Sequence, residues 1–322
     1  MKKFLLRRLY TSIITFFIVI TFVFFAIRFT GDPLAELEDD PRITPEVLNK
    51  IRTLFGLDKP VHIQFIDYLV NIFRGELGYS LHYKRPVIDV ICSKLPYTLM
   101  LLIPSITLSN YIAYKLGVEC GWRRRSTFDL IVSSIAFTVR SIPYFWLAIL
   151  FLYIFSVQLR ITPLFGAISP GKGGFSLSLD WIMDYLWHYI LPFTVLTLRA
   201  SLALIPYVRN ALIEVLEEDY IITAHAKGIP LKTVKYSHVA RNAILPVITI
   251  MGLRYAFLID GAILTETVFS YPGTGKVVFE AIINRDYWLL QGAVVILTLS
   301  VIIVNLIVDL IYVLLDPRIR YR

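Results

Sequence analysis

The first residues to consider are those whose types and spacing could support phosphate binding or catalysis. Residues 273–276 (Gly-Thr-Gly-Lys) look like part of a phosphate-binding loop, but that pattern needs glycine at 270 and Ser or Thr at 277. The chain has Ser270 and Val277 there. Residues 78–80 (Gly-Tyr-Ser) lack the second glycine of a nucleophile elbow, because position 82 is histidine. Neither segment predicts an enzyme.

Metal-ligand spacing is also missing from the sequence. No two of the five histidines lie four residues apart or at another ligand spacing: His62, His82, His188, His225 and His238. Structural or interfacial roles fit them better than ligand roles. The sequence therefore predicts no metal site and no cofactor bound by this chain.

Charged residues inside long apolar segments are the remaining candidates for chemistry. Each costs roughly 2.5–3.5 kcal/mol at the centre of a membrane helix, so it usually faces a partner or a cavity. Either they form ion pairs that hold a helix bundle together, or some of them line a translocation pathway. We expect at least one of these charged residues to face a pathway. The candidate pathway residues are the charged Arg140, Arg199, Arg254, Asp260 and Glu266, together with Ser141 and Pro143.

The composition predicts the elements that hold these residues. The chain has 322 residues, of which 57% are hydrophobic and 17% charged, and its mean hydropathy is +0.67. Soluble domains carry about a quarter charged residues, and blocks of about 20 apolar residues match the bilayer core. The net charge of +8 lies in clusters beside apolar segments, which indicates contact with anionic lipid and not with nucleic acid.

About six transmembrane helices are expected. The first, within residues 1–30, has an apolar run longer than that of a signal peptide and no cleavage pattern, so we interpret it as retained. The others are expected at Leu95–Val118, Leu130–Val157, Trp187–Val208, Leu245–Phe269 and Leu289–Leu315. Pro104, Pro143, Pro192 and Pro206 lie inside these segments, either as passive kinks or as bends that line a pathway.

Residues 31–94 have no apolar run long enough to span a membrane. Thr44-Pro45-Glu46 predicts a helix start, with the helix ending at Gly56, and a second amphipathic helix is expected over Val61–Phe73. Basic residues cluster at the N-terminus, at 123–125, at 209–241 and at the C-terminus. The Lys/Arg bias therefore predicts both termini in the cytoplasm and 31–94 as an external insertion.

The segment 217–246 lies in one of the basic loops. Its sequence predicts a helix that ends at Gly228, a turn at Ile229-Pro230 and a short amphipathic helix. Leu231, Val234 and His238 are expected on one side of that helix, and Lys232 and Lys235 on another. On its own, such a helix could simply lie on the membrane surface.

This segment resembles the cytoplasmic "EAA" loop of ABC-importer permeases, in the form seen in the first permease of the dipeptide/oligopeptide/nickel family. The general motif is met in part. Ala224 and Gly228 fit it, but Ile222 stands where the general motif has glutamate, which the family's own variant also lacks. The matching positions are Asp219, Tyr220, Thr223, Ala224, Ala226, Lys227, Gly228, His238, Arg241, Asn242, Leu245 and Pro246.

Further matches extend the resemblance over almost the whole chain. They include residues 4–9, 31–33, 44–46, 55–60, 75–80, 141–146, 266–269, 272–275, 305–309 and 315–318. The resemblance implies an all-α integral membrane protein with the type I ABC importer permease fold. The expected parts are the first helix (1–30), the external insertion (31–94) and the core permease domain (95–322) with its coupling loop (210–244).

The resemblance also implies function and partners. A second homologous permease would enclose the pathway, two ATP-binding subunits would dock in the cytoplasm, and an external solute-binding protein would deliver peptides. Nickel-chelate or oligosaccharide import stays open, and a secondary transporter, a channel or a membrane-embedded enzyme is a weaker alternative. The residues expected to couple to an ATPase subunit are Thr223, Ala224, Ala226, Lys227, Gly228, Pro230, Leu231, Val234, His238 and Arg241.

Overall fold

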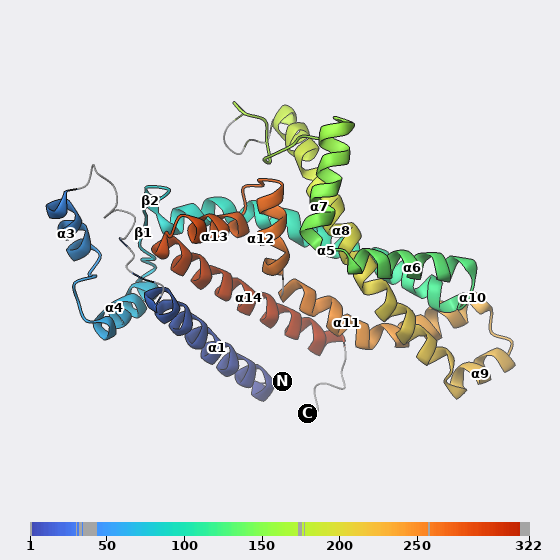
Figure 1. Ribbon diagram of the computed structural model, residues 1–322. Helices are drawn as coiled ribbons and strands as arrows, with labels where there is room; N and C mark the ends of the chain where they lie inside the picture. The colour runs from blue at the N-terminus through green and yellow to red at the C-terminus, as the bar shows by residue number, and fades with distance from the viewer. Residues whose placement is uncertain are drawn as a thin grey trace. The chain divides into compact units, whose positions relative to one another are not determined.

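The computed structural model describes residues 2–29, 31, 34, 44–172, 176, 178–256 and 258–315, with the side chains of 2–5, 256, 258–262 and 311–315 left out. The matches at 32–33 and 316–318, and the side chain of Asp260, therefore lie outside the described residues. The described chain is almost entirely helical (Figure 1), with one two-stranded antiparallel hairpin.

The elements follow one another in a simple order. They are α1 Lys2–Phe29, α3 Pro45–Leu54, α4 Val61–Arg74, β1 Tyr79–Ser80, β2 Arg85–Pro86, α5 Val87–Trp122, α6 Thr127–Ser141, α7 Tyr144–Phe151, the π-helix η1 Leu152–Gln158, α8 Leu179–Leu216, α9 Asp219–Ala226, α10 Leu231–Thr233, the π-helix η2 Val234–Ala240, α11 Arg241–Ala256, α12 Leu258–Val268, α13 Thr274–Ile283 and α14 Tyr287–Leu315.

Four of the described helices are long and apolar enough to cross a membrane: Leu6–Phe29, Val87–Trp122, Leu179–Leu216 and Tyr287–Leu310. A fifth candidate is the pair Thr127–Ser141 and Tyr144–Gln158, which bends by 103°. The expected span Leu245–Phe269 coincides with α11 and α12, which flank residue 257, outside the described residues. An all-α membrane protein is confirmed, and a sixth span stays a prediction.

The expected span over Leu130–Val157 is broken at the predicted position of Pro143. Ile142 is extended (φ −79°, ψ 129°), because a residue before proline is disfavoured in the helical conformation. Pro143 then starts α7. By contrast, Pro192 and Pro206 lie inside the unbroken α8.

Two predicted boundaries also differ. Helix α5 begins at Val87, inside the predicted insertion, and α8 continues to Leu216, inside the predicted coupling loop. Both helices continue past the apolar part of their span into residues that were predicted as insertion or loop.

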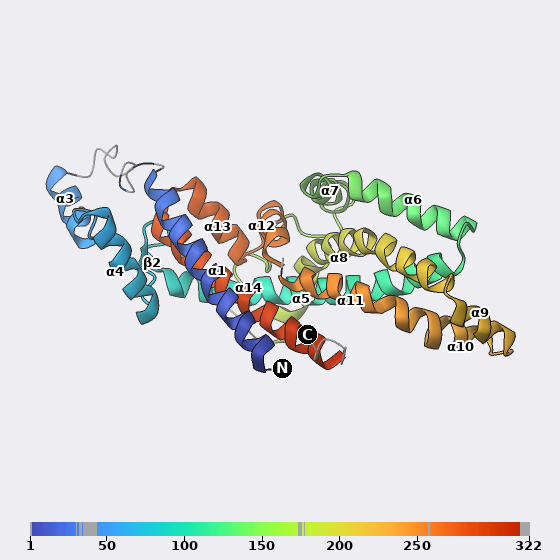
Figure 2. The ribbon, with the colours of Figure 1, turned by 90° about the horizontal axis from the view of Figure 1, so that it is seen from below.

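The chain forms two units, residues 1–96 with 276–303, and residues 97–275 with 304–322. In the first unit, α1 lies beside α14 (Figures 1 and 2), and the buried Phe16, Ile20 and Val295 form their common core. Tyr68 of α4 stacks on Phe24 of α1, with ring centroids 5.3 Å apart. The predicted helix starts and ends are confirmed here, because the Thr44 side chain caps α3 and Gly56 has φ +64°.

Two large apolar cores lie in the described part of the second unit, beside a smaller cluster around Leu102. One packs α6, α8, the 217–246 segment and α11 together around residues such as Ile205, Leu212 and Val234 (Figure 2). The other packs α7, the start of α8 and the turn after α12 around Leu147, Val195 and Tyr271. The candidate functional residues are attached to these two cores.

Candidate functional site

The 217–246 segment begins where α8 ends. Helix α9 stops at Ala226, and Gly228 adopts φ +71° while its N–H donates to the His225 carbonyl (2.9 Å). This left-handed conformation favours glycine. The predicted helix end and turn are therefore confirmed.

The helix after the turn differs from the predicted short, separate one. Helix α10, the π-helix η2 and α11 follow one another without a break, so the segment continues directly into α11. Single π-helical turns in α-helices are frequent at functional sites. The Asn242 amide donates to the Tyr220 hydroxyl (2.9 Å) and ties α9 to α11.

The segment has a buried face and an exposed face. Ala224 and Val234, both expected to couple to a partner, are buried in the core of their own chain, and their part in coupling stays a prediction. Most of the other expected contact residues are exposed, and His238 is half-buried: Thr223, Ala226, Lys227, Gly228, Pro230, Leu231 and Arg241 form the exposed set. Apolar side chains are also left uncovered there, because Ile222 and Leu231 are each 63% exposed.

Lys235 contradicts the predicted polar face. Its side chain is only 9% exposed, and its ammonium pairs with Glu119 at the end of α5. Lys235 is buried like its neighbour Val234 in η2, whereas Leu231 is exposed. Glu119 is 116 residues away in the sequence, and no local pattern indicates this partner.

A second buried ion pair lies at the same end of this unit. Asp129 is 1% exposed, and Arg209 of α8 donates to both of its carboxylate oxygens (2.5 and 2.7 Å). The Arg125 N–H and the Ser133 hydroxyl also donate to Asp129. This bidentate geometry joins α6 firmly to α8.

The predicted pathway residues have different surroundings. Arg140, Ser141 and Pro143 are exposed around the bend between α6 and α7. The Arg140 guanidinium lies over the Tyr207 ring (5.8 Å to the centroid), and that of Arg199 over Tyr144 (5.3 Å). The Arg199 Nε is buried and has no hydrogen-bond partner among the described residues.

Arg254 and Glu266 make contacts within their own unit. Arg254 donates to Asn110 (2.8 Å), Ser109 (3.3 Å) and the Ala200 carbonyl (2.8 Å). Glu266 is fully buried, so its carboxylate does not face an open pathway in this conformation.

Glu266 organises the turn between α12 and α13. It accepts hydrogen bonds from the Thr98 hydroxyl (2.6 Å) and the Gly275 N–H (2.7 Å). A Cβ at Gly273 would lie 2.0 Å from Glu266 Oε1. Gly273 and Gly275 therefore belong to a turn built around a buried carboxylate.

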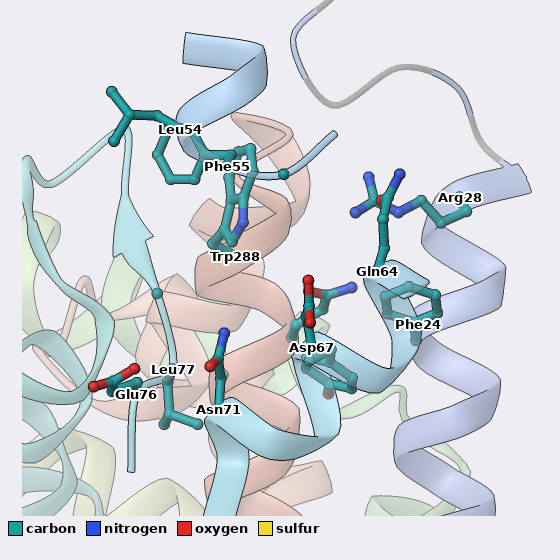
Figure 3. A pocket seen from close by; sticks show the side chains of 15 residues that line it. Phe24, Arg28, Leu54, Phe55, Gln64, Asp67, Asn71, Glu76, Leu77 and Trp288 are labelled. Carbon is teal, nitrogen blue, oxygen red and sulfur yellow. The ribbon is translucent and has the colours of Figure 1, made fainter. Parts of the chain in front are cut away.

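The first unit has a cavity of about 260 Å³ between α1, α4 and α14. Figure 3 shows Phe55 against Trp288, whose ring centroids are 4.2 Å apart, and Asp67 and Asn71 on α4 facing the cavity. In the described part of the chain, Gln64 Oε1 and the Tyr68 hydroxyl are buried without hydrogen-bond partners. Burial raises the pKa of the Tyr68 hydroxyl.

The hairpin beside this cavity is fixed to the segment before α14. The Ser80 hydroxyl and the His82 N–H donate to the buried Asp286 carboxylate (2.6 and 3.1 Å). Tyr83 donates to Glu280, and burial together with this carboxylate raises the pKa of the Tyr83 hydroxyl. Among the described residues, no group of three or more His, Cys, Asp or Glu could hold a metal ion.

The long apolar helices are typical of a multi-pass membrane protein. Residues 113–321 match the family model of the binding-protein-dependent transport system inner membrane component, and residues 1–102 match the N-terminal model for such components. The chain belongs to this family and is a permease subunit of an ABC importer.

Full-length relatives have the same description. The chain is 36% identical to the di/tripeptide transport system permease of Pseudomonas aeruginosa and to the dipeptide transport system permease of Escherichia coli K12. It is 35% identical to the glutathione transport system permease of Salmonella choleraesuis. Each match covers 100% of both proteins.

Proposed function

We propose that this permease imports di- or oligopeptides and forms the translocation pathway with a second, homologous permease. The observation that carries the proposal is full-length similarity to permeases named for dipeptides, di/tripeptides and glutathione, which is itself a tripeptide. Import of a nickel chelate or an oligosaccharide by the same machinery is the outcome that a transport assay must exclude.

The 217–246 segment is the proposed docking surface for an ATP-binding subunit. Its exposed residues Ile222, Lys227 and Leu231 lie on a segment that is continuous with α11. Exposed apolar residues rimmed by polar ones favour a protein contact. Motion of a docked subunit would pass to α11 directly, and ATP and Mg²⁺ would be held by the partner subunits.

This assignment implies an orientation of the protein in the membrane. The segment carries Lys227, Lys232 and Arg241, and the N-terminus and residues 123–125 are also basic. The positive-inside rule then supports both termini in the cytoplasm of a cell membrane. Residues 31–94 would face outward, where the cavity beside Phe55 and Trp288 supports contact with an external solute-binding protein.

For the translocation pathway we retain the residues around the bend. Arg140, Ser141 and Pro143 are exposed. The buried Nε of Arg199 has no hydrogen-bond partner in the described part of the chain. Arg254 and Glu266 are assigned instead to holding their helices together, because their polar groups are bound within the unit. A role for Asp260 stays a prediction.

Gentle detergent purification from the native membrane, followed by mass spectrometry, tests the proposed assembly. A second permease and two ATP-binding chains are expected to co-purify. Proteoliposomes with that complex and its binding protein should then import radiolabelled dialanine, but not a nickel chelate or an oligosaccharide. Isolation of this chain alone in several detergents, or import of only the other solutes, would contradict the proposal.

A Gly228→Pro variant tests the docking segment. Proline removes the N–H that bonds to His225 and cannot adopt φ +71°. We expect normal membrane insertion and complete loss of peptide import and of coupled ATP hydrolysis. Transport at the wild-type rate would contradict the assignment, and Gly171→Pro, at an exposed glycine outside the segment, is the matched control.

A further inference from the structure

Lys235 lies in an unusual environment for an exposed, basic segment. Its ammonium contacts the Glu119 carboxylate and lies 5.7 Å from the Trp122 ring centroid and 5.1 Å from that of Tyr236. A buried charge is tolerated when it is paired, and aromatic faces add cation–π attraction. One carboxylate and two rings thus hold the lysine head.

Two of these three partners belong to the end of α5. Glu119 and Trp122 lie in its last turn, and Arg123 pairs with Glu119 from the other side (2.7 Å). Glu119 is therefore shared between a residue next to its own helix and a residue of the 217–246 segment. The Lys235 pair is the contact that crosses from that segment to α5.

Helix α5 is in turn closely packed against α8. A Cβ at Gly117 would lie 2.5 Å from Val208 Cβ, and one at Gly121 would lie 2.8 Å from Leu212 Cδ2. Glycines spaced by four residues allow membrane helices to approach this closely. A displacement of the end of α5 is therefore passed on to α8.

We propose that Lys235 is a positioning residue that transmits motion of the 217–246 segment to α5 through Glu119. The inference rests on the proposed docking of an ATP-binding subunit to this segment. Val234 and Val239 of the segment also pack into the apolar core, but apolar packing is non-directional. The ion pair fixes one point of the segment to one point of α5.

The test is the ratio of ATP hydrolysed to dialanine imported by the full complex in proteoliposomes. Lys235→Met keeps the length of the side chain and leaves Glu119 paired with Arg123, so the complex should still assemble. We expect the ratio to rise by at least about fivefold, the lower end of typical coupling between two sites. Lys235→Arg should restore it, and Lys115→Met, at an exposed lysine of α5 one turn before Glu119, should leave it unchanged.

A second variant keeps the inference testable if Lys235→Met does not assemble. Glu119→Gln removes the charge but keeps the shape, and it should raise the same ratio. Together with Lys235→Met it should have less than the summed effect, because both break one contact. A wild-type ratio in either variant, or equal effects of Lys115→Met and Lys235→Met, would overturn the inference. Failure of the wild-type complex to hydrolyse ATP would instead contradict the proposed function.

Discussion

Asp129 and Glu266 are two carboxylates that are buried almost completely in the same unit, but they are held in different ways. Asp129 meets the end of a long, flexible arginine from another helix, at 2.5 and 2.7 Å. Glu266 meets the Thr98 hydroxyl and the Gly275 backbone, and Gly273 lies so close that a Cβ has no room. The Asp129 pair can tolerate small shifts, because the arginine side chain is flexible. The Glu266 contacts cannot, because they involve the backbone and a close-packed glycine.

The difference indicates which contacts can follow helix motion. The Arg209 side chain can change rotamer while its ion pair stays formed, so the Asp129–Arg209 pair can persist as helices shift. A backbone N–H and a glycine contact move only with their whole turn. We therefore expect the region around Asp129 to adjust between states, and the turn at residues 266–275 to move as one body.

The largest effect is expected from Arg209→Met. It leaves Asp129 buried with only neutral donors, and breaking a buried pair in this way costs about 3–5 kcal/mol. The unfolding midpoint of the purified chain, followed by size-exclusion chromatography after heating, should fall strongly. Asp129→Ala should cost less, because the Arg209 side chain is 24% exposed and can reach solvent. Equal losses in the two variants would contradict the role of burial.

A smaller effect is expected from Gly273→Ala. The added methyl group would lie 2.0 Å from Glu266 Oε1, and overpacking of this kind typically costs about 1–3 kcal/mol. The same thermal assay measures it. In a Glu266→Ala background the methyl group has room, so the second substitution should add little. Additive losses would show that Glu266 does not occupy the space beside Gly273.

Local signals in the sequence predicted the local structure well. Thr44-Pro45 starts α3, and Gly228 ends the helix of the 217–246 segment, because capping and left-handed glycines act within a few residues. The effect of proline was less predictable. Pro143 breaks its helix while Pro192 does not, and packing of neighbouring helices decides between these outcomes.

The docking site stays a prediction, and the burial of its side chains could not be derived from the sequence. Its exposed residues follow from the family resemblance, whereas the burial of Ala224, Val234 and Lys235 depends on where α5 and α8 lie. Glu119 and Trp122 were missed, because their role arises from a contact across more than a hundred residues. A long-range pair of this kind leaves no periodic signal in one sequence.

The smallest effect is expected from Arg124→Met. Arg124 and Glu217 form a pair at 2.7 Å, but their side chains are 46% and 67% exposed. Water and salt screen such a pair, so its loss should cost about 0–1 kcal/mol. The unfolding midpoint should remain close to that of the wild-type protein. Because Arg124 and Arg209 carry the same group near the same ends of α5 and α8, a large loss in Arg124→Met would show that charge, and not burial, makes Arg209 important.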